Sequence, residues 1–425
     1  MLQSVSPKHD LPLKPEGQAA KPERTGTWAP FSIQAFRIIW ICNLFANLGT
    51  WAQSVAAAWV VTDAHASPLM VAMIQVAAAL PLVLLSILSG VIADNHDRRK
   101  IMLWGLSFEM TGAMFATLLA FLGYLDPVLL IISILWISLG GSVTIPAWQA
   151  AVNEQVPARM VSDAVLLNSV NYNVARAAGP ALGGLLYAFG ASWVYVPTAT
   201  LYVLACVLTL SLPVRNQPLT QGKATLDSLL AGIRFIRSRP DIFGAISLDL
   251  FAVLLGGATA LLPVFAKDIL LTGPWGLGLL RSAPAVGALA MSFWLAHFSI
   301  ERNVGRIMFL SVGIFGLATI AFGLSKSFWL SLGVLVVLGA ADMVSMVIRG
   351  AFVQLETPDE MRGRVSAVNG LFIGASNQLG EFESGLTAHW FGTVPAVVLG
   401  GIGTLVVTGA WMKLFPSLAQ RDRLH

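Results

Sequence analysis

The chain alternates between long apolar runs and short polar connections. Twelve of these runs are each about as long as the ~20 residues that a helix needs to cross a bilayer. They cover residues 38–61, 69–93, 101–122, 128–151, 163–189, 193–212, 242–266, 275–298, 307–324, 328–352, 365–389 and 394–415. Continuous apolar stretches argue against a β-barrel, whose strands would alternate between apolar and polar positions. The pattern therefore predicts an all-α membrane protein with twelve transmembrane helices.

The composition also indicates that lipid is the solvent. Of the 425 residues, 56% are hydrophobic and 11% are charged, whereas soluble proteins average about 25% charged residues. The two cysteines, Cys42 and Cys206, lie in apolar runs and form neither a disulfide framework nor a metal-binding spacing. The sequence contains no G-x-x-x-x-G-K-[ST] loop, so direct ATP drive is not expected. We expect no metal, no cofactor, no enzymatic activity and no nucleic-acid partner.

The two halves of the chain resemble one another. Residues 156–186 align with residues 357–387 at an offset of 201, which pairs Pro157 with Pro358 and Gly184 with Gly385. Six spans followed by six related spans are typical of a transporter built from two similar bundles. We therefore predict an N-terminal six-helix bundle over residues 35–213 and a C-terminal six-helix bundle over residues 241–417.

Polar segments flank the predicted bundles. Residues 1–34 carry no apolar core of a signal peptide and are expected to form a disordered cytoplasmic tail. Residues 418–425 are expected to form a cytoplasmic tail at the other end. The linker, residues 214–240, contains apolar residues at helical spacing, followed by three arginines. These are Leu226, Leu229, Leu230, Ile233 and Ile236, with Arg234, Arg237 and Arg239. They predict an amphipathic helix that lies on the inner leaflet, or else an ordinary connector helix.

The basic residues predict the orientation. Of the 26 lysines and arginines, 20 lie in the tails or in connections of one parity, and two, Lys267 and Lys326, lie in connections of the other. Positive charge accumulates on the cytoplasmic side. Both termini are therefore expected in the cytoplasm, with the protein in a bacterial-type inner membrane.

A dense charge cluster separates the second and third runs. The stretch GVIADNHDRRK, residues 90–100, resembles the G-x-L-A-D-R-x-G-R-R/K signature of the major facilitator superfamily. It departs from that signature at Asn95, where Arg is usual, and at Asp97, where Gly is usual. Asp97 and the stretches NLGTWAQSVAAAWVV, PAWQA, ARAAGPALGG and RGRVSA resemble the subgroup that includes the enterobactin exporters and related secretion permeases.

This resemblance implies a monomeric transporter in which two bundles rock around a central site. A cytoplasmic gate would then be formed by the charge cluster and the start of the eleventh run. The candidate gating residues are Gly90, Asp94, Arg98, Arg99, Arg362 and Arg364. Asp94 would face a helix N-terminus, where free N–H groups favour a carboxylate. The alternative is that the cluster only marks the cytoplasmic side.

Charged residues inside the runs are candidates for coupling, because they are costly in lipid. Asp249 and Asp342 are expected at one depth, about 10 Å from the cytoplasmic edge, where one of two carboxylates could carry a proton. Glu381 lies on a polar stripe of the eleventh run, and Glu383 points elsewhere. The candidate charge partners are Arg176, Arg281 and Arg349. Alternatively, these carboxylates bind neighbouring Asn or Ser side chains, and Glu109 is expected to be structural.

Polar and aromatic residues in runs expected to line the cavity are candidate substrate contacts. They are Asn43, Asn47, Gln53, Trp148, Gln149 and Asn377. Together the features predict a proton-coupled exporter of a small amphiphilic organic molecule, a siderophore or a drug, with the substrate, protons and the lipid bilayer as partners. The alternatives are an importer or uniporter of another small solute, or a membrane sensor or scaffold that does not transport.

Overall fold

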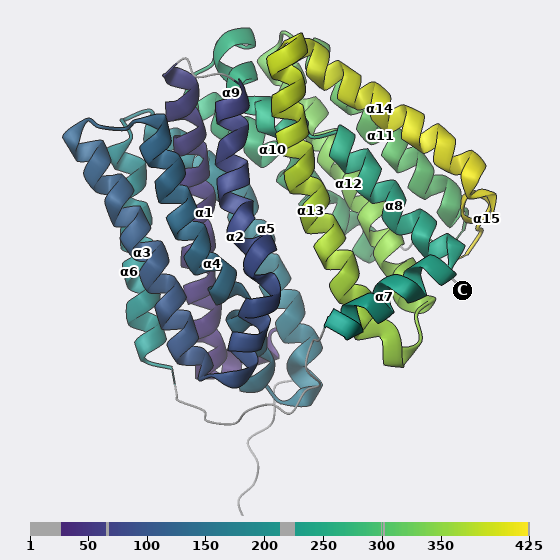
Figure 1. The fold of residues 1–425 in the computed structure, drawn as a ribbon, viewed down its shortest axis with the longest axis horizontal. Helices are drawn as coiled ribbons and strands as arrows, with labels where there is room; N and C mark the ends of the chain where they lie inside the picture. The colour runs from purple at the N-terminus through teal and green to yellow at the C-terminus, as the bar shows by residue number, and fades with distance from the viewer. Residues whose placement is uncertain (1–26, 65–67, 213–225, 299, 301, 424–425) are drawn as a thin grey trace, which may run out of the picture.

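A computed structural model describes residues 27–64, 68–212, 226–298, 300 and 302–423. Most of the predicted N-terminal tail, much of the linker and the last two residues lie outside this part of the chain. Two groups of long helices stand side by side (Figure 1). We call the end at which the first long helix finishes, at Asp63, the Asp63 end, and the opposite end the linker end.

The N-terminal bundle contains six long helices. They are α1 (Gln34–Asp63), α2 (Pro68–Asn95), α3 (Arg98–Leu122), α4 (Pro127–Gln155), α5 (Val161–Tyr187) and α6 (Ser192–Leu210). Two short 3₁₀ turns, η1 (Ala29–Ser32) and η2 (Ala158–Met160), precede α1 and α5.

The C-terminal half begins with a short helix and continues with six long helical segments. The elements are α7 (Leu226–Ser238), α8 (Pro240–Leu255), η3 (Ala258–Leu261), α9 (Leu262–Val264), the π-helical turn η4 (Phe265–Ile269), α10 (Pro274–His297), α11 (Val304–Leu324), α12 (Phe328–Leu355), α13 (Asp359–Phe391), α14 (Thr393–Leu414) and α15 (Pro416–Ala419).

The predicted fold class is confirmed: each of the twelve apolar runs falls on a long helical segment, in two six-membered bundles. Among the described residues, eight segments are long and apolar enough to cross a membrane on their own. The other four, α1, α2, α5 and α13, lie where the bundles meet. Within α2, the described apolar stretch is Leu69–Leu82.

The seventh span differs from the continuous helix that its apolar run suggests. Helix α8 ends at Leu255, and the chain continues through η3, α9 and η4. The break falls at Gly256 and Gly257. A Cβ built on Gly257 would lie 2.5 Å from the carbonyl oxygen of Gly380 in α13. The break therefore lets the backbone of this span lie directly against α13.

Local sequence explains several helix ends. The Asp97 carboxylate accepts a hydrogen bond from the backbone N–H of Arg99 at 3.0 Å and caps α3. Gly123, with φ of 72°, ends the same helix in the left-handed conformation that glycine adopts easily. Asp126 caps α4 by accepting from the N–H of Val128 at 2.8 Å, and Pro127 occupies the first helical position.

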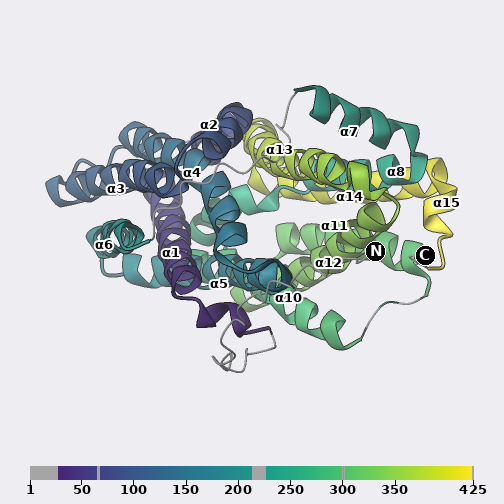
Figure 2. The same cartoon turned by 90° about the horizontal axis from the view of Figure 1, so that it is seen from below.

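The bundles meet along two pairs of helices. Helix α2 packs on α13 and α5 packs on α10 (Figure 2). Near the Asp63 end, Val55 and Trp59 of α1 join one apolar cluster with Leu261, Phe265 and Leu277 of the other bundle. This cluster attaches the bundles to one another at the Asp63 end.

Helix α7 lies across the start of α13 at the linker end (Figure 1). A Cβ on Gly232 would lie 3.0 Å from the carbonyl oxygen of Arg364, and Ile236 is buried in the core of the C-terminal bundle. Leu230 remains 54% exposed and Ile233 is also exposed. The side chains of Leu226 and Leu229 lie outside the described residues, so only part of the predicted apolar face can be assigned.

Candidate transport pathway

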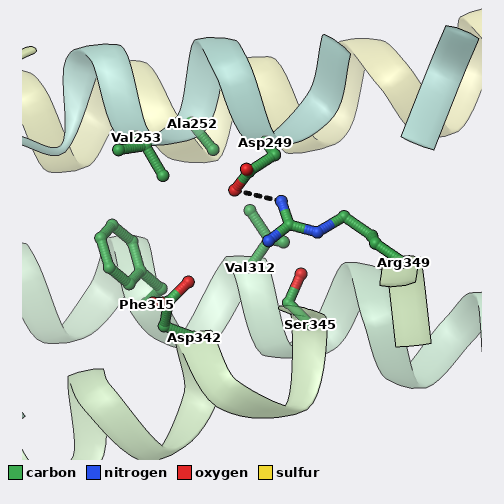
Figure 3. Close-up of a pocket in the computed structure, with 8 residues that line it drawn as sticks. All are labelled: Asp249, Ala252, Val253, Val312, Phe315, Asp342, Ser345 and Arg349. Atoms are coloured by element: carbon green, nitrogen blue, oxygen red, sulfur yellow. Dashed lines mark ion pairs between the residues drawn. The ribbon is translucent and has the colours of Figure 1, made fainter. Parts of the chain in front are cut away.

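An ion pair lies inside the C-terminal bundle. Arg349 of α12 contacts the Asp249 carboxylate of α8, and each residue is only 8% exposed (Figure 3). The carboxylate of Asp342, two helical turns before Arg349, points into the same small pocket. Ser345 and Phe315 also line this pocket. The structure thus brings together two of the predicted coupling carboxylates and one predicted arginine.

Asp342 differs from Asp249 in its surroundings. It is half-buried, and none of the ion pairs found within the described chain involves it. The positive charges of Arg349 and of Arg176, which comes from the opposite bundle, both act on it. Asp342 therefore lies between the pocket and the interface of the two bundles.

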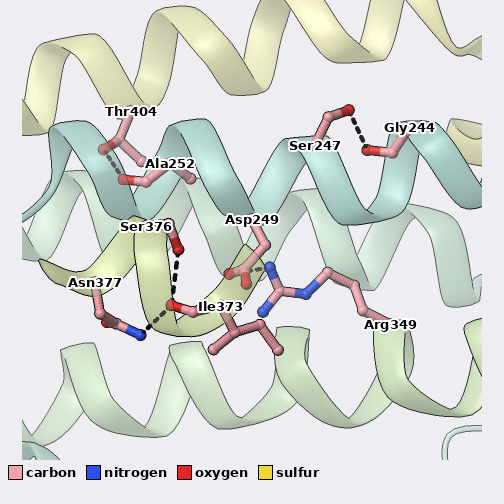
Figure 4. A network of polar contacts seen from close by, with 9 residues as sticks. All are labelled: Gly244, Ser247, Asp249, Ala252, Arg349, Ile373, Ser376, Asn377 and Thr404. Carbon is pink, nitrogen blue, oxygen red and sulfur yellow. Dashed lines mark hydrogen bonds and ion pairs between the residues drawn. The ribbon is translucent and has the colours of Figure 1, made fainter. Parts of the chain in front are cut away.

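Backbone contacts fix the helices around the ion pair (Figure 4). The Thr404 hydroxyl of α14 donates to the carbonyl oxygen of Ala252 at 3.0 Å and ties α14 to α8. In α13, Asn377 donates to the carbonyl oxygen of Ile373 at 2.9 Å. The side-chain amide of Asn377 thus donates within its own helix, and the residue remains exposed.

A second polar group joins the two bundles nearer the Asp63 end. Arg281 of α10 donates to the Ser54 hydroxyl of α1 at 3.2 Å. Glu381 of α13 accepts from Thr259 at 3.5 Å, and Gln75 of α2 approaches the same carboxylate. The charge of Arg281 acts on Glu381. Because these residues come from both bundles, any opening of the Asp63 end must rearrange them.

Glu383 belongs to neither group. It accepts a hydrogen bond from Thr387 in its own helix at 2.6 Å. Its position two residues from Glu381 turns it to another face of α13.

Helices α1 and α5 share a polar and aromatic stripe. Asn43 donates to Asn168 at 2.6 Å, and Asn47 donates to the carbonyl oxygen of Asn43 at 2.9 Å. Further along the same helices, the ring centroids of Trp51 and Tyr172 are 6.2 Å apart. Arg176 lies over the Trp51 ring, 6.0 Å from its centroid.

The remaining predicted contact residues lie in different environments. Trp148 is buried in the apolar core of the N-terminal bundle, and Gln53 is buried in α1. Gln149 is exposed. Glu109, expected to be structural, is buried between α3 and α4, where a Cβ on Gly140 would lie 2.9 Å from its Cγ.

The candidate gating residues gather at the linker end. Arg98 is buried, and the Arg99 guanidinium donates to the carbonyl oxygen of Leu210. Arg362 and Arg364 are exposed at the start of α13, and Arg362 donates to the carbonyl oxygen of Gln354 at 3.3 Å. The surroundings of Gly90 and the side chain of Asp94 lie outside what the structure describes. Their gating role therefore stays a prediction.

One contact between the bundles was not predicted. Lys267 in η4 forms an ion pair with Asp63 at 3.1 Å and donates to the carbonyl oxygens of Thr62 and Asp63 at 3.0 and 3.2 Å. A lysine at a helix C-terminus is favoured by the helix dipole. Its position in a connection that is otherwise poor in basic residues was the sequence signal that could have identified it.

Comparison with known proteins identifies the family. The profile described as transmembrane secretion effector matches residues 25–423. The chain belongs to this family of the major facilitator superfamily. An uncharacterized MFS-type transporter of Bacillus subtilis, YfiS, is 26% identical over 402 residues, which cover 89% of this chain and 92% of the relative. The enterobactin exporter EntS of Shigella boydii is 28% identical over 321 residues, 75% of this chain and 73% of that protein.

Solved structures share the fold at low sequence identity. A bacterial homologue of the lysosomal transporter spinster, inward-facing and occupied, has a TM-score of 0.72 at 13% identity and covers 92% of this chain and 98% of its own. An inward-facing bacterial homologue of ferroportin has a TM-score of 0.69 at 18% identity, with 91% and 99% covered. These likenesses support the same two-bundle architecture in this chain.

Proposed function

We propose that the protein is a proton-coupled exporter of a small amphiphilic organic molecule, such as a siderophore or a drug. The observation that carries this proposal is the group formed by Asp249, Asp342 and Arg349 inside a membrane-spanning bundle. Such charges are costly in lipid and are kept where a transported species needs them. The similarity to an enterobactin exporter favours export.

Alternating access supplies the mechanism. The contacts of Lys267, Arg281 and Gly278 close the Asp63 end, which we assign to the outside of the cell, and the linker end faces the cytoplasm. Substrate would enter from the cytoplasm and leave when the bundles rock apart at the Asp63 end.

Asp342 is the carboxylate best suited to exchange a proton. It is half-buried and free of an ion pair within the described chain, whereas Asp249 is held by Arg349 and Glu383 by Thr387. In this scheme a proton enters from outside and binds Asp342 as substrate leaves, and it is released to the cytoplasm after the bundles rock back. The Asp249–Arg349 pair fixes the electrostatic environment in which this exchange takes place.

The test is uptake into inverted membrane vesicles with an acidic lumen. The probes are three permanently charged or neutral naphthalene compounds: naphthalenesulfonate, naphthalenesulfonamide and naphthylmethyl-trimethylammonium. We expect uphill uptake of at least one probe, and its loss in Asp342→Asn with retained probe binding. Asp249→Asn, Glu381→Gln and Glu383→Gln serve as matched variants. Uphill uptake that is unchanged in all four variants would refute coupling through these carboxylates, and no uptake of any probe would argue against export of such molecules.

A further inference from the structure

Arg176 lies in the middle of α5 without a direct counterion. Its side chain is exposed, and among the described residues no carboxylate lies within ion-pair distance of it. Asp342 of α12 and Glu381 of α13 are both within its electrostatic range. Because both carboxylates belong to the opposite bundle, Arg176 faces the space between the bundles rather than lipid.

The contact of Arg176 with Trp51 leaves its hydrogen-bond donors available. The guanidinium carbon lies 6.0 Å from the Trp51 ring centroid, and no hydrogen bond from Arg176 is found among the described residues. The guanidinium carries five N–H donors in a fixed planar fork. Those donors match the oxygens of a carboxylate, sulfonate or phosphate in a two-point contact. The geometry thus prepares a binding position for an anion.

Aromatic surface adjoins this position. Tyr172 lies one turn before Arg176 on α5 and is 45% exposed, and its ring is in edge contact with Trp51. An aromatic ligand can stack on such a surface, as aromatic rings do in offset or edge-to-face pairs. Toward the linker end the stripe continues with Asn43, Asn47 and Asn168, whose side-chain amides are hydrogen-bonded among themselves.

We infer that Arg176, Trp51 and Tyr172 form a binding subsite for a molecule that carries an aromatic ring joined to an anionic group. This inference rests on the proposed function and narrows its substrate class. The Asp342 charge across the interface attracts Arg176 from the other side, so the alternative is that Arg176 pairs with Asp342 when the bundles move.

The test compares binding of the three naphthalene probes to the purified full-length protein in detergent by calorimetric titration. We expect naphthalenesulfonate to bind at least tenfold more tightly than the trimethylammonium compound, with the sulfonamide between them. Arg176→Gln should weaken naphthalenesulfonate binding roughly tenfold or more, since a charge-assisted hydrogen bond is lost. Arg176→Lys should weaken it less, and Trp51→Leu should weaken the sulfonate and the sulfonamide alike by several-fold.

The matched control is Arg306→Gln, which removes an exposed arginine at the start of α11. Each variant is first checked by its thermal unfolding, so that a misfolded variant is not read as a loss of binding. Equal or tighter binding of the cation, or unchanged sulfonate binding in Arg176→Gln, would overturn the inference and favour pairing with Asp342. This readout does not depend on a proton gradient, so its failure is distinct from failure of the vesicle assay.

Discussion

The pair of Asp249 and Arg349 lies in a pocket whose apolar lining comes from Ala252 and Val253 of α8 and from Val312 and Phe315 of α11. Bringing two such charges out of water is costly, and their mutual attraction compensates only while both partners are present. The pair is therefore a weak source of stability, yet the loss of Arg349 leaves the buried Asp249 carboxylate without its partner.

We predict that Arg349→Gln lowers the free energy of unfolding by about 3–5 kcal/mol, the usual effect of removing one member of a buried ion pair. The double variant Asp249→Asn/Arg349→Gln should recover much of this loss, because neither charge of the pair remains and Arg176 still acts on Asp342. Thermal unfolding in detergent measures both. Ser345→Ala, in the same pocket, is the control, and a double variant no more stable than Arg349→Gln would contradict the argument.

The crossing of α5 and α10 is set by small residues. A Cβ on Gly278 would lie 2.5 Å from the carbonyl oxygen of Pro180 and 3.0 Å from Cα of Gly184. Neither neighbour is a flexible side chain that could move away. The two helices can therefore approach this closely only while these positions carry no side chain.

We predict that Gly278→Ala separates α5 from α10 and lowers stability by about 1–3 kcal/mol, the usual penalty of overpacking. The control is Gly313→Ala in α11, where an added Cβ meets no atom within 4 Å. That change should be neutral or slightly stabilising, because alanine favours helix more than glycine does. If both variants unfold at the same temperature, the crossing is more adaptable than the geometry indicates.

Lys267 links the two bundles at the Asp63 end of the whole molecule. It combines an ion pair with two hydrogen bonds to the last carbonyls of α1. Asp63 is largely exposed, so the contact is worth about 1 kcal/mol or less. A contact with so small a free energy can favour the closed arrangement without preventing the Asp63 end from opening.

We predict that Lys267→Gln shifts the molecule toward opening at the Asp63 end by up to roughly fivefold. The reporter is Val55→Cys, buried in the cluster between the bundles, in a background with Cys42→Ser and Cys206→Ser. A membrane-impermeant maleimide added outside intact cells should label it faster in Lys267→Gln than in the control Lys326→Gln. Equal labelling rates would exclude Lys267 as a latch, and labelling only from the cytoplasmic side would reverse the proposed orientation.

The sequence predicts the fold well because the length and polarity of each run decide whether it can span a membrane, and because Asp97, Asp126 and Gly123 mark helix ends locally. The break at Gly257 was not predictable, since it depends on the approach of Gly380 from far along the chain.

The candidate pathway was predictable only as a set of residues. Charges inside apolar runs are visible in the sequence, but helix rotation decides that Asp249 meets Arg349 while Arg176 meets Trp51. The rotation of α4 likewise places the Trp148 side chain in the core of the N-terminal bundle.

Within the part of the chain that the structure describes, the bundles approach one another closely through the backbones of Pro180, Gly184, Pro274 and Gly278. These residues have no rotamers to lose, whereas each long flexible side chain immobilised at an interface forfeits up to ~2 kcal/mol of conformational entropy. If this end opens once in every cycle, the helices can separate and dock again there without any side chain having to find its place. The speed of docking at this crossing then depends on how fast two rigid surfaces meet, not on a search among side-chain conformations.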